Sequence, residues 1–135
     1  MKVKLSTKPW RLAKRNTETE SLKKVVIDAV LGKKGHQVMS LDLKKIKDTP
    51  SDYFIITHGD SSTQVRAIYL NVVEEAEKHG FRPYHMEGMK NSEWIIIDFV
   101  DVVVHVFYRD KRDFYALEDL WSDAKIARHN ETAHK

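Results

Sequence analysis

Two carboxylates, an imidazole and an indole lie close together in the run of residues 94–107. They belong to Asp98, Asp101, His105 and Trp94. Carboxylates and imidazoles, here with His85 or Glu87 nearby, can hold a divalent metal ion or transfer protons. Their spacing matches no established set of metal ligands, and aspartates beside turns often bond nearby amides instead. A large aromatic ringed by charges is also typical of a protein-recognition surface, so a metal or catalytic site, turn architecture and recognition all stay open.

A second candidate site is the segment Gly59-Asp60-Ser61, which joins an expected strand to an expected helix. Free amides at a helix N-terminus can bind phosphate. Nucleotidyltransferases use a similar Gly-Ser turn, closely followed by an Asp-x-Asp pair that binds metal, and no such pair follows here. Ser61-x-x-Gln64 instead has the spacing of a capping box, in which two side chains bond the first amides of a helix. Helix capping is therefore the favoured interpretation.

The polar groups of the first candidate site must be positioned by a hairpin. Apolar and polar residues alternate along both halves of the run, which predicts two short strands joined by a tight turn. Even-numbered residues of the first strand then share a face with odd-numbered residues of the second. A turn centred on residues 99–100 places Asp98 opposite Asp101. The same turn places Trp94 opposite His105, and leaves the other face of the hairpin as aliphatic core.

The remaining periodicity predicts an α/β domain with the element order α-β-β-α-β-β-β-α. Apolar residues at helical spacing predict helices, and short alternating or continuous apolar runs predict strands. The expected elements are a helix over 18–34 ended by Gly35, a strand within Gln37–Ile46, a buried strand Tyr53–Thr57, a helix from Ser61 to Gly80, a strand within Phe81–Met86, the hairpin, and a helix capped by Asp110 that presents Phe114, Leu117 and Trp121. This order folds as one mixed sheet with helices packed against it.

Length and composition indicate a single globular domain. The chain has 135 residues, of which 41% are hydrophobic and 32% are charged, enough for one core. We expect a flexible basic arm at 1–17, a folded domain at 18–128 and a polar tail at 129–135. Cysteine is absent, which excludes disulfides and thiolate chemistry. No apolar stretch reaches the length of a membrane span and no secretory signal is evident, so we expect a cytoplasmic protein.

Charge is unevenly distributed along the chain. Residues 1–48 carry a net charge of +8, whereas residues 49–135 carry −5. A basic arm on a mildly acidic body suits a protein that works beside RNA without reading its sequence, and the simpler alternative is a solubilising tail. A free-standing RNA-binding module is disfavoured, since no motif of interleaved aromatic and basic residues is present.

Three ordered blocks of the sequence resemble the ribosomal silencing factor family, also called the Iojap family. They are residues 51–68 (SDYFIITHGDSSTQVRAI), the hairpin run with the preceding Met86-Glu87-Gly88, and residues 112–124 (RDFYALEDLWSDA). The resemblance extends from about Ser21 to Ala124. One departure is Val100, where members of the family usually carry glycine. Because valine disfavours a positive φ, we expect another turn type or a longer loop at this position.

The resemblance implies both a fold and a function. The implied fold is a mixed five-stranded sheet flanked by helices, similar to a nucleotidyltransferase but without its catalytic site. The implied activity is binding, not catalysis. Members dock on the large ribosomal subunit at ribosomal protein L14 and sterically block joining of the small subunit, which lowers translation under nutrient limitation. Organelle members act in assembly of the large subunit.

The implied contact surface combines the hairpin face, the loop before the hairpin and the last helix. Its residues are Trp94, Asp98, Asp101, His105, Glu87, Gly88, Arg112 and Tyr115. The resemblance implies no catalytic residue, metal or cofactor. The basic arm can add non-specific contact with ribosomal RNA, and the free protein can form a homodimer. The alternative function is a nucleotidyltransferase-like phosphoryl-transfer enzyme that uses Gly59, Ser61 and the two aspartates.

Overall fold

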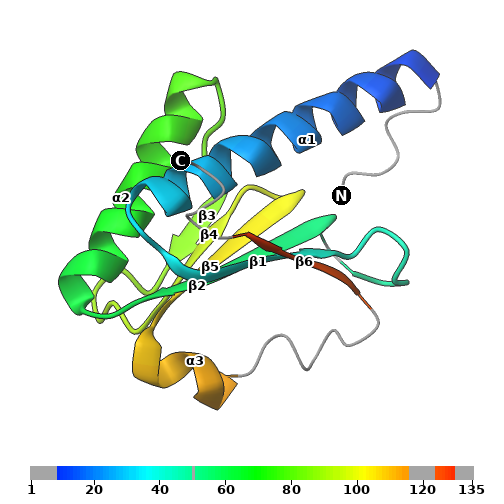
Figure 1. The fold of residues 1–135 in the computed structure, drawn as a ribbon. Coiled ribbons are helices and arrows are strands. Elements are labelled where there is room, and N and C mark those ends of the chain that lie inside the picture. Colours follow the sequence, from blue (N-terminus) through cyan, green and yellow to red (C-terminus); the bar gives the residue numbers. More distant parts are fainter. Residues whose placement is uncertain (1–8, 50, 116–123, 130–135) are drawn as a thin grey trace.

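The protein is an α/β domain built on one mixed six-stranded sheet (Figure 1). The computed structural model describes residues 9–49, 51–115 and 124–129. The elements in chain order are α1 (Pro9–Gly32), β1 (His36–Asp42), β2 (Tyr53–Gly59), α2 (Ser62–Lys78), β3 (His85–Glu87), β4 (Trp94–Asp98), β5 (Val102–Tyr108), α3 (Arg109–Tyr115) and β6 (Lys125–His129). Among the described helices, none has the length and apolar character needed to cross a membrane.

The strands lie in the order β3-β4-β5-β2-β1-β6. Only the central pair, β2 and β5, is parallel, and every other neighbouring pair is antiparallel. All seven residues of β2 are buried, which confirms the prediction of a strand covered on both faces. The central strand β2 is therefore covered on both faces. Exposed side chains occur in the edge strands β3 and β6.

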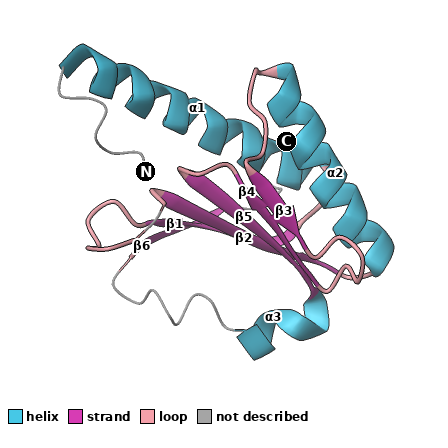
Figure 2. Ribbon diagram, turned by 180° about the vertical axis from the view of Figure 1, so that it is seen from behind, coloured by secondary structure: helices cyan, strands magenta, loops and turns pink. Residues whose placement is uncertain are grey.

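Buried apolar side chains form two clusters, one on each face of the sheet. Helices α1 and α2 lie together on one face, and α3 lies on the other side (Figure 2). The larger cluster joins both long helices to side chains such as Ile55, Ile97 and Val104. The smaller cluster lies on the opposite face and includes Phe54 and Phe107. The aliphatic side of the predicted hairpin is therefore core, as expected.

Two boundaries differ from the sequence-based expectation. Helix α1 begins at Pro9 and ends at Gly32, whereas the sequence predicts a helix over 18–34. Proline is well suited to the first position of a helix, because its fixed φ is helical and it has no amide to satisfy. Strand β6 is absent from the predicted elements, since Lys125–His129 is mostly polar. It forms by antiparallel pairing along the free edge of β1, so a tertiary contact sets its conformation.

The hairpin forms as predicted, but its register differs by two residues. Trp94 pairs with Phe107, and Asp98 pairs with Val103. The turn residues are Val100 and Asp101, and the Phe99 N–H donates to the Val102 carbonyl at 2.9 Å. The predicted pairs of Asp98 with Asp101 and Trp94 with His105 are therefore wrong. A shift of two residues preserves which side chains share a face, so the face assignment of Trp94, Asp98 and His105 is confirmed.

Val100 adopts a φ of +80° in this tight turn, so the expectation that valine avoids a positive φ through a longer loop is wrong. The Val100 N–H donates to Asp98 Oδ1 at 2.7 Å, and the Asp101 N–H donates to the Phe99 carbonyl at 3.1 Å. A β-branched residue with a positive φ is strained. These hydrogen bonds, together with the pairing of the flanking strands, hold the valine in that conformation.

The N-terminus of α2 confirms the predicted Ser61 cap, whereas Gln64 bonds the amide one residue before the cap. Ser61 Oγ accepts from the Gln64 N–H at 3.0 Å, while Gln64 Oε1 accepts from the Asp60 N–H at 2.7 Å. The Gln64 amide also donates to the Lys33 and Lys34 carbonyls, at 3.2 and 2.9 Å. One glutamine thus ties the start of α2 to the end of α1, and the Gly59–Ser61 segment has a structural role.

Candidate partner-binding surface

The candidate surface is the sheet face opposite the two long helices, over strands β3, β4 and β5. Cross-strand partners point to the same side of a sheet, so the pairing registers identify its members. They are Trp94, Ile96 and Asp98 of β4, Val103, His105 and Phe107 of β5, and His85 and Glu87 of β3. We call this set the hairpin face. It gathers one indole, two carboxylates and two imidazoles around an apolar centre.

Trp94 is fixed in place although its side chain is only partly buried. Its indole stacks on the Phe107 ring, with centroids 5.3 Å apart and planes inclined by 23°. Its Nε1–H donates to His105 Nδ1 at 3.0 Å. Stacking and a hydrogen bond together leave the indole little rotamer freedom, so its exposed edge is presented at low entropic cost.

His105 is a neutral, buried ring beside the indole. An indole N–H can only donate, so Nδ1 accepts and the neutral ring carries its proton on Nε2. Burial lowers the pKa of His105 from 6.5 to about 3. Among the described residues, Nε2 has no hydrogen-bond partner. His105 is 5% exposed, so it holds Trp94 through the hydrogen bond and does not present a titrating group to solvent.

Strand β3 supplies the outer edge of the hairpin face. His85 Nε2 and Glu87 Oε2 lie 2.8 Å apart, and both side chains are exposed. Gly88 follows with a φ of +87°, and a Cβ at this position would lie 2.0 Å from the Trp94 carbonyl oxygen. Only glycine lets the loop pass this close to β4, so the candidate residue Gly88 acts through its backbone.

Asp98 and Asp101 lie on different sides of the hairpin. Asp98 belongs to the hairpin face through its pairing with Val103. Asp101 Oδ2 instead accepts a hydrogen bond from Thr19 Oγ1 of α1 at 3.4 Å. The Asp101 carbonyl also accepts from the Asp52 and Tyr53 amides, at 2.9 and 3.0 Å. Asp101 therefore ties the turn to β2 and α1, and the two carboxylates do not form a pair.

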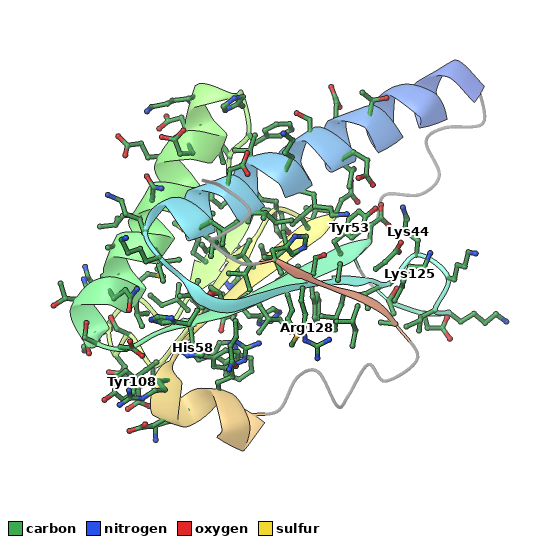
Figure 3. The ribbon with its side chains drawn as sticks, viewed as in Figure 1. Lys44, Tyr53, His58, Tyr108, Lys125 and Arg128 are labelled. Atoms are coloured by element: carbon green, nitrogen blue, oxygen red, sulfur yellow. The ribbon has the colours of Figure 1, made fainter. Side chains whose placement is uncertain are left out.

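Arg112 is buried and bonded within the protein. Its guanidinium donates to the Gln37 carbonyl at 2.9 Å and contacts His58 Nδ1 at 3.0 Å. Burial, and then the charge of Arg112, lower the pKa of His58 from 6.5 to about 4. Figure 3 shows Tyr53 on the side of the sheet that faces α1 and His58 near α3. Arg112 thus connects α3 to the sheet, and the side chain of the candidate Tyr115 lies outside the described residues.

The hairpin face presents a partly exposed indole with carboxylates and imidazoles beside it. Within the described ranges, no three His, Asp or Glu side chains converge in a way that could hold a metal ion. The imidazole of His105 is buried and bonded to Trp94, and the Gly59–Ser61 segment is engaged in capping. Sequence reasoning missed Tyr84, which is exposed beside the hairpin. An aromatic residue between Pro83 and the polar His85 was the signal that could have identified it.

Comparisons with known proteins give one consistent result. The family model described as "Ribosomal silencing factor during starvation" matches residues 16–135. The ribosomal silencing factor of Bacillus subtilis (strain 168) is 39% identical over 108 residues, which cover 80% of this chain and 91% of that protein. A crystal structure of a protein from Chromobacterium violaceum has a TM-score of 0.74 at 33% identity, and the match covers 77% of this chain and 86% of that one.

A more distant similarity reaches a mitochondrial protein. The mouse (Mus musculus) protein named "Mitochondrial assembly of ribosomal large subunit protein 1" is 33% identical over 75 residues. The match covers 53% of this chain and 33% of that protein. The name connects that relative to the large ribosomal subunit.

Proposed function

This chain belongs to the ribosomal silencing factor family, and we propose that it represses translation by occupying the large ribosomal subunit. In this proposal the hairpin face binds ribosomal protein L14 and sterically blocks joining of the small subunit. The names of the bacterial relatives and of the mitochondrial assembly protein support a role at the large subunit. Binding is sufficient for this activity, so no catalytic step is needed.

The observation that carries the proposal is the arrangement of Trp94. Interface hot spots are typically aromatic, rigid and surrounded by polar residues. The Trp94 indole is stacked on Phe107 and bonded to His105, yet it keeps part of its surface exposed. A side chain that served only the core would not need to stay at the surface. We therefore assign Trp94 the role of anchor.

The charged residues of the hairpin face give the anchor its selectivity. Asp98 and Glu87 share the face with Trp94 through the β3–β4–β5 pairing, and a carboxylate favours a partner with lysine or arginine at the matching position. Blocking subunit joining requires only occupancy of a surface that the small subunit also needs. A patch of roughly 800 Å² on each partner is enough for specific binding.

The remaining candidate residues act by positioning. Gly88 lets its loop approach β4, His105 supports Trp94, Asp101 ties down the turn, and Arg112 holds α3 against the sheet. Contact of the basic N-terminal residues with ribosomal RNA and a homodimer of the free protein remain predictions, as does a cytoplasmic location.

Co-sedimentation with isolated large ribosomal subunits tests the proposal. We expect the parent protein to pellet with large subunits, and we expect Trp94→Ala to weaken binding by about thirtyfold, the cost of losing a typical anchor. The matched control is Leu70→Ala, which truncates a 52% exposed side chain on α2 and should bind like the parent. Failure of the parent protein to co-sediment would contradict the proposal.

Thermal unfolding separates an anchor from a core residue. We expect the Trp94→Ala protein to unfold cooperatively, because the indole is only partly buried. Loss of a cooperative transition would show that Trp94 serves the core instead.

A further inference from the structure

A cleft lies at the turn end of the hairpin face. It has a volume of about 340 Å³ and is lined by Ser51, Phe54, Tyr84, Asp98, Val100 and Val103. These residues come from the start of β2, the approach to β3 and both sides of the hairpin turn. The volume is at the low end of the range of small-molecule sites, about 300–1,000 Å³. It is therefore large enough to admit one long side chain of a partner protein.

The walls of the cleft are apolar and part of them faces solvent. The base is formed by Phe54 and Val103, which are almost fully buried in the smaller core cluster. The rim carries Tyr84, which is 78% exposed, and Val100, which is 38% exposed. In the described part of the chain only one other large hydrophobic residue, Leu70, is exposed. Two of these three exposed residues, Tyr84 and Val100, therefore line the same cleft.

A single carboxylate gives the cleft its polarity. Asp98 Oδ1 accepts the N–H of Val100 at 2.7 Å, and this bond fixes the orientation of the carboxylate. Within the residues that the structure describes, Oδ2 accepts no hydrogen bond and Asp98 has no ion pair. An oriented carboxylate beside apolar and aromatic walls favours a cation that has a long apolar stem.

The backbone at Val100 is strained where it forms the rim. Its φ is +80°, a region that costs a β-branched residue free energy and that glycine adopts freely. The valine side chain is 38% exposed and belongs to neither apolar cluster. Strain of this kind is concentrated at functional sites.

We propose that this cleft receives an arginine side chain of the protein partner, and that Val100 improves the fit at the expense of stability. The inference rests on the proposed function, since the partner is the one bound by the hairpin face. The methylene stem lies on Phe54 and Val103, and the guanidinium meets Asp98 while stacking on the Tyr84 ring. Arginine is chosen over lysine because its planar group both stacks on aromatic rings and pairs with carboxylates.

The first test compares Val100→Gly with the parent in two measurements. Glycine relieves the positive φ, so we expect the midpoint of thermal unfolding to rise by a few degrees. Glycine also removes one wall of the cleft, so we expect affinity for isolated large subunits to fall about threefold to tenfold. Unchanged or tighter binding by this variant would overturn the role of Val100.

The second test is a double-mutant cycle on Tyr84→Ala and Asp98→Asn. Each change should weaken large-subunit binding about tenfold. The double variant should bind more tightly than the product of the two losses predicts, because both side chains contact one arginine. If Tyr84→Ala weakens binding but Asp98→Asn does not, the occupant is apolar and the arginine assignment is wrong.

The outcomes distinguish this inference from the proposed function. A parent protein that fails to bind large subunits would contradict both. If the parent binds, Trp94→Ala weakens the binding, and all three cleft variants bind like the parent and like Leu70→Ala, then only the cleft inference is overturned.

Discussion

At the scale of single residues, the geometry of the hairpin face depends on a buried histidine, His105. His105 accepts the indole N–H of Trp94 through Nδ1, which fixes both the tautomer of the imidazole and the orientation of the indole. Because the ring is desolvated, its pKa falls to about 3. The folded state therefore binds this proton far more weakly than the unfolded chain does.

This difference predicts a pH dependence of stability. A folded pKa below the unfolded value of 6.5 means that the contribution is fully present above pH 6.5 and is lost progressively as the pH falls. Between pH 7 and pH 5 the loss from His105 should be about 2 kcal/mol in the free energy of unfolding. Urea unfolding at the two pH values measures it.

His105→Gln is the matched variant for that measurement. Glutamine does not titrate, and its side-chain oxygen can still accept the Trp94 indole N–H. We expect the free energy of unfolding of this variant to fall by about 2 kcal/mol less than that of the parent between the two pH values. His58, whose pKa is also lowered, contributes the same pH dependence to both proteins. An equal loss in parent and variant would mean that His105 is not a desolvated neutral ring.

The sequence revealed residue types more readily than contacts. It identified Trp94, Asp98 and His105 as members of one face, because alternation along strands depends only on parity. It could not identify the internal role of Arg112, because the carbonyls and the histidine that the guanidinium contacts lie in β1 and β2, far away in the chain. It also paired Asp98 with Asp101, since it placed the turn one residue too early.

At the scale of elements, a close backbone approach sets the position of Trp94. Strand β4 begins at Trp94, and the loop before it passes so near that a Cβ on Gly88 would lie 2.0 Å from the Trp94 carbonyl oxygen. The Ser92 N–H donates to the Gly88 carbonyl at 3.1 Å, which closes the loop. The start of β4 therefore depends on glycine at this position.

Gly88→Ala should destabilise the protein by about 2–4 kcal/mol, because it adds a steric clash to the cost of a positive φ. The matched control is Gly80→Ala. Gly80 has the same φ of +87°, but a Cβ there meets nothing within 4 Å. The control isolates the conformational cost, so the difference between the two variants measures the clash. Equal losses of stability in the two variants would show that the loop relaxes away from Trp94.

Most elements could be predicted because their patterns are local. The central strand β2, the Ser61 cap and the hairpin follow from short-range periodicity and spacing. Strand β6 and the first turns of α1 could not be predicted in this way. The sequence of Lys125–His129 has little strand character of its own, and pairing with β1 determines its conformation.

At the scale of the whole molecule, a cluster of positive charge lies at the N-terminus, far in sequence from the residues of the hairpin face. Residues 1–15 contain six basic residues and no acidic residue, while the chain as a whole has a net charge of +3. We propose that these cations bind phosphates of ribosomal RNA. When a substitution removes one such phosphate contact, the slope of log affinity for large subunits against log salt concentration should decrease in magnitude by about 0.7–0.9.

Glutamine substitution tests this without shortening α1, which begins at Pro9. The six positions are Lys2, Lys4, Lys8, Arg11, Lys14 and Arg15. We expect the substituted protein to bind large subunits less tightly at low salt and to show a smaller salt slope. A slope equal to that of the parent would mean that these residues only improve solubility.

The most direct test of the central claim is a subunit-joining assay followed by light scattering. We expect the parent protein, preincubated with large subunits, to prevent the rise in scattering that accompanies joining of small subunits. Trp94→Ala should require about thirtyfold more protein for the same inhibition, in line with the loss of one anchor, and Leu70→Ala should inhibit like the parent. Joining that proceeds normally in the presence of saturating parent protein would show that the protein does not block the small subunit.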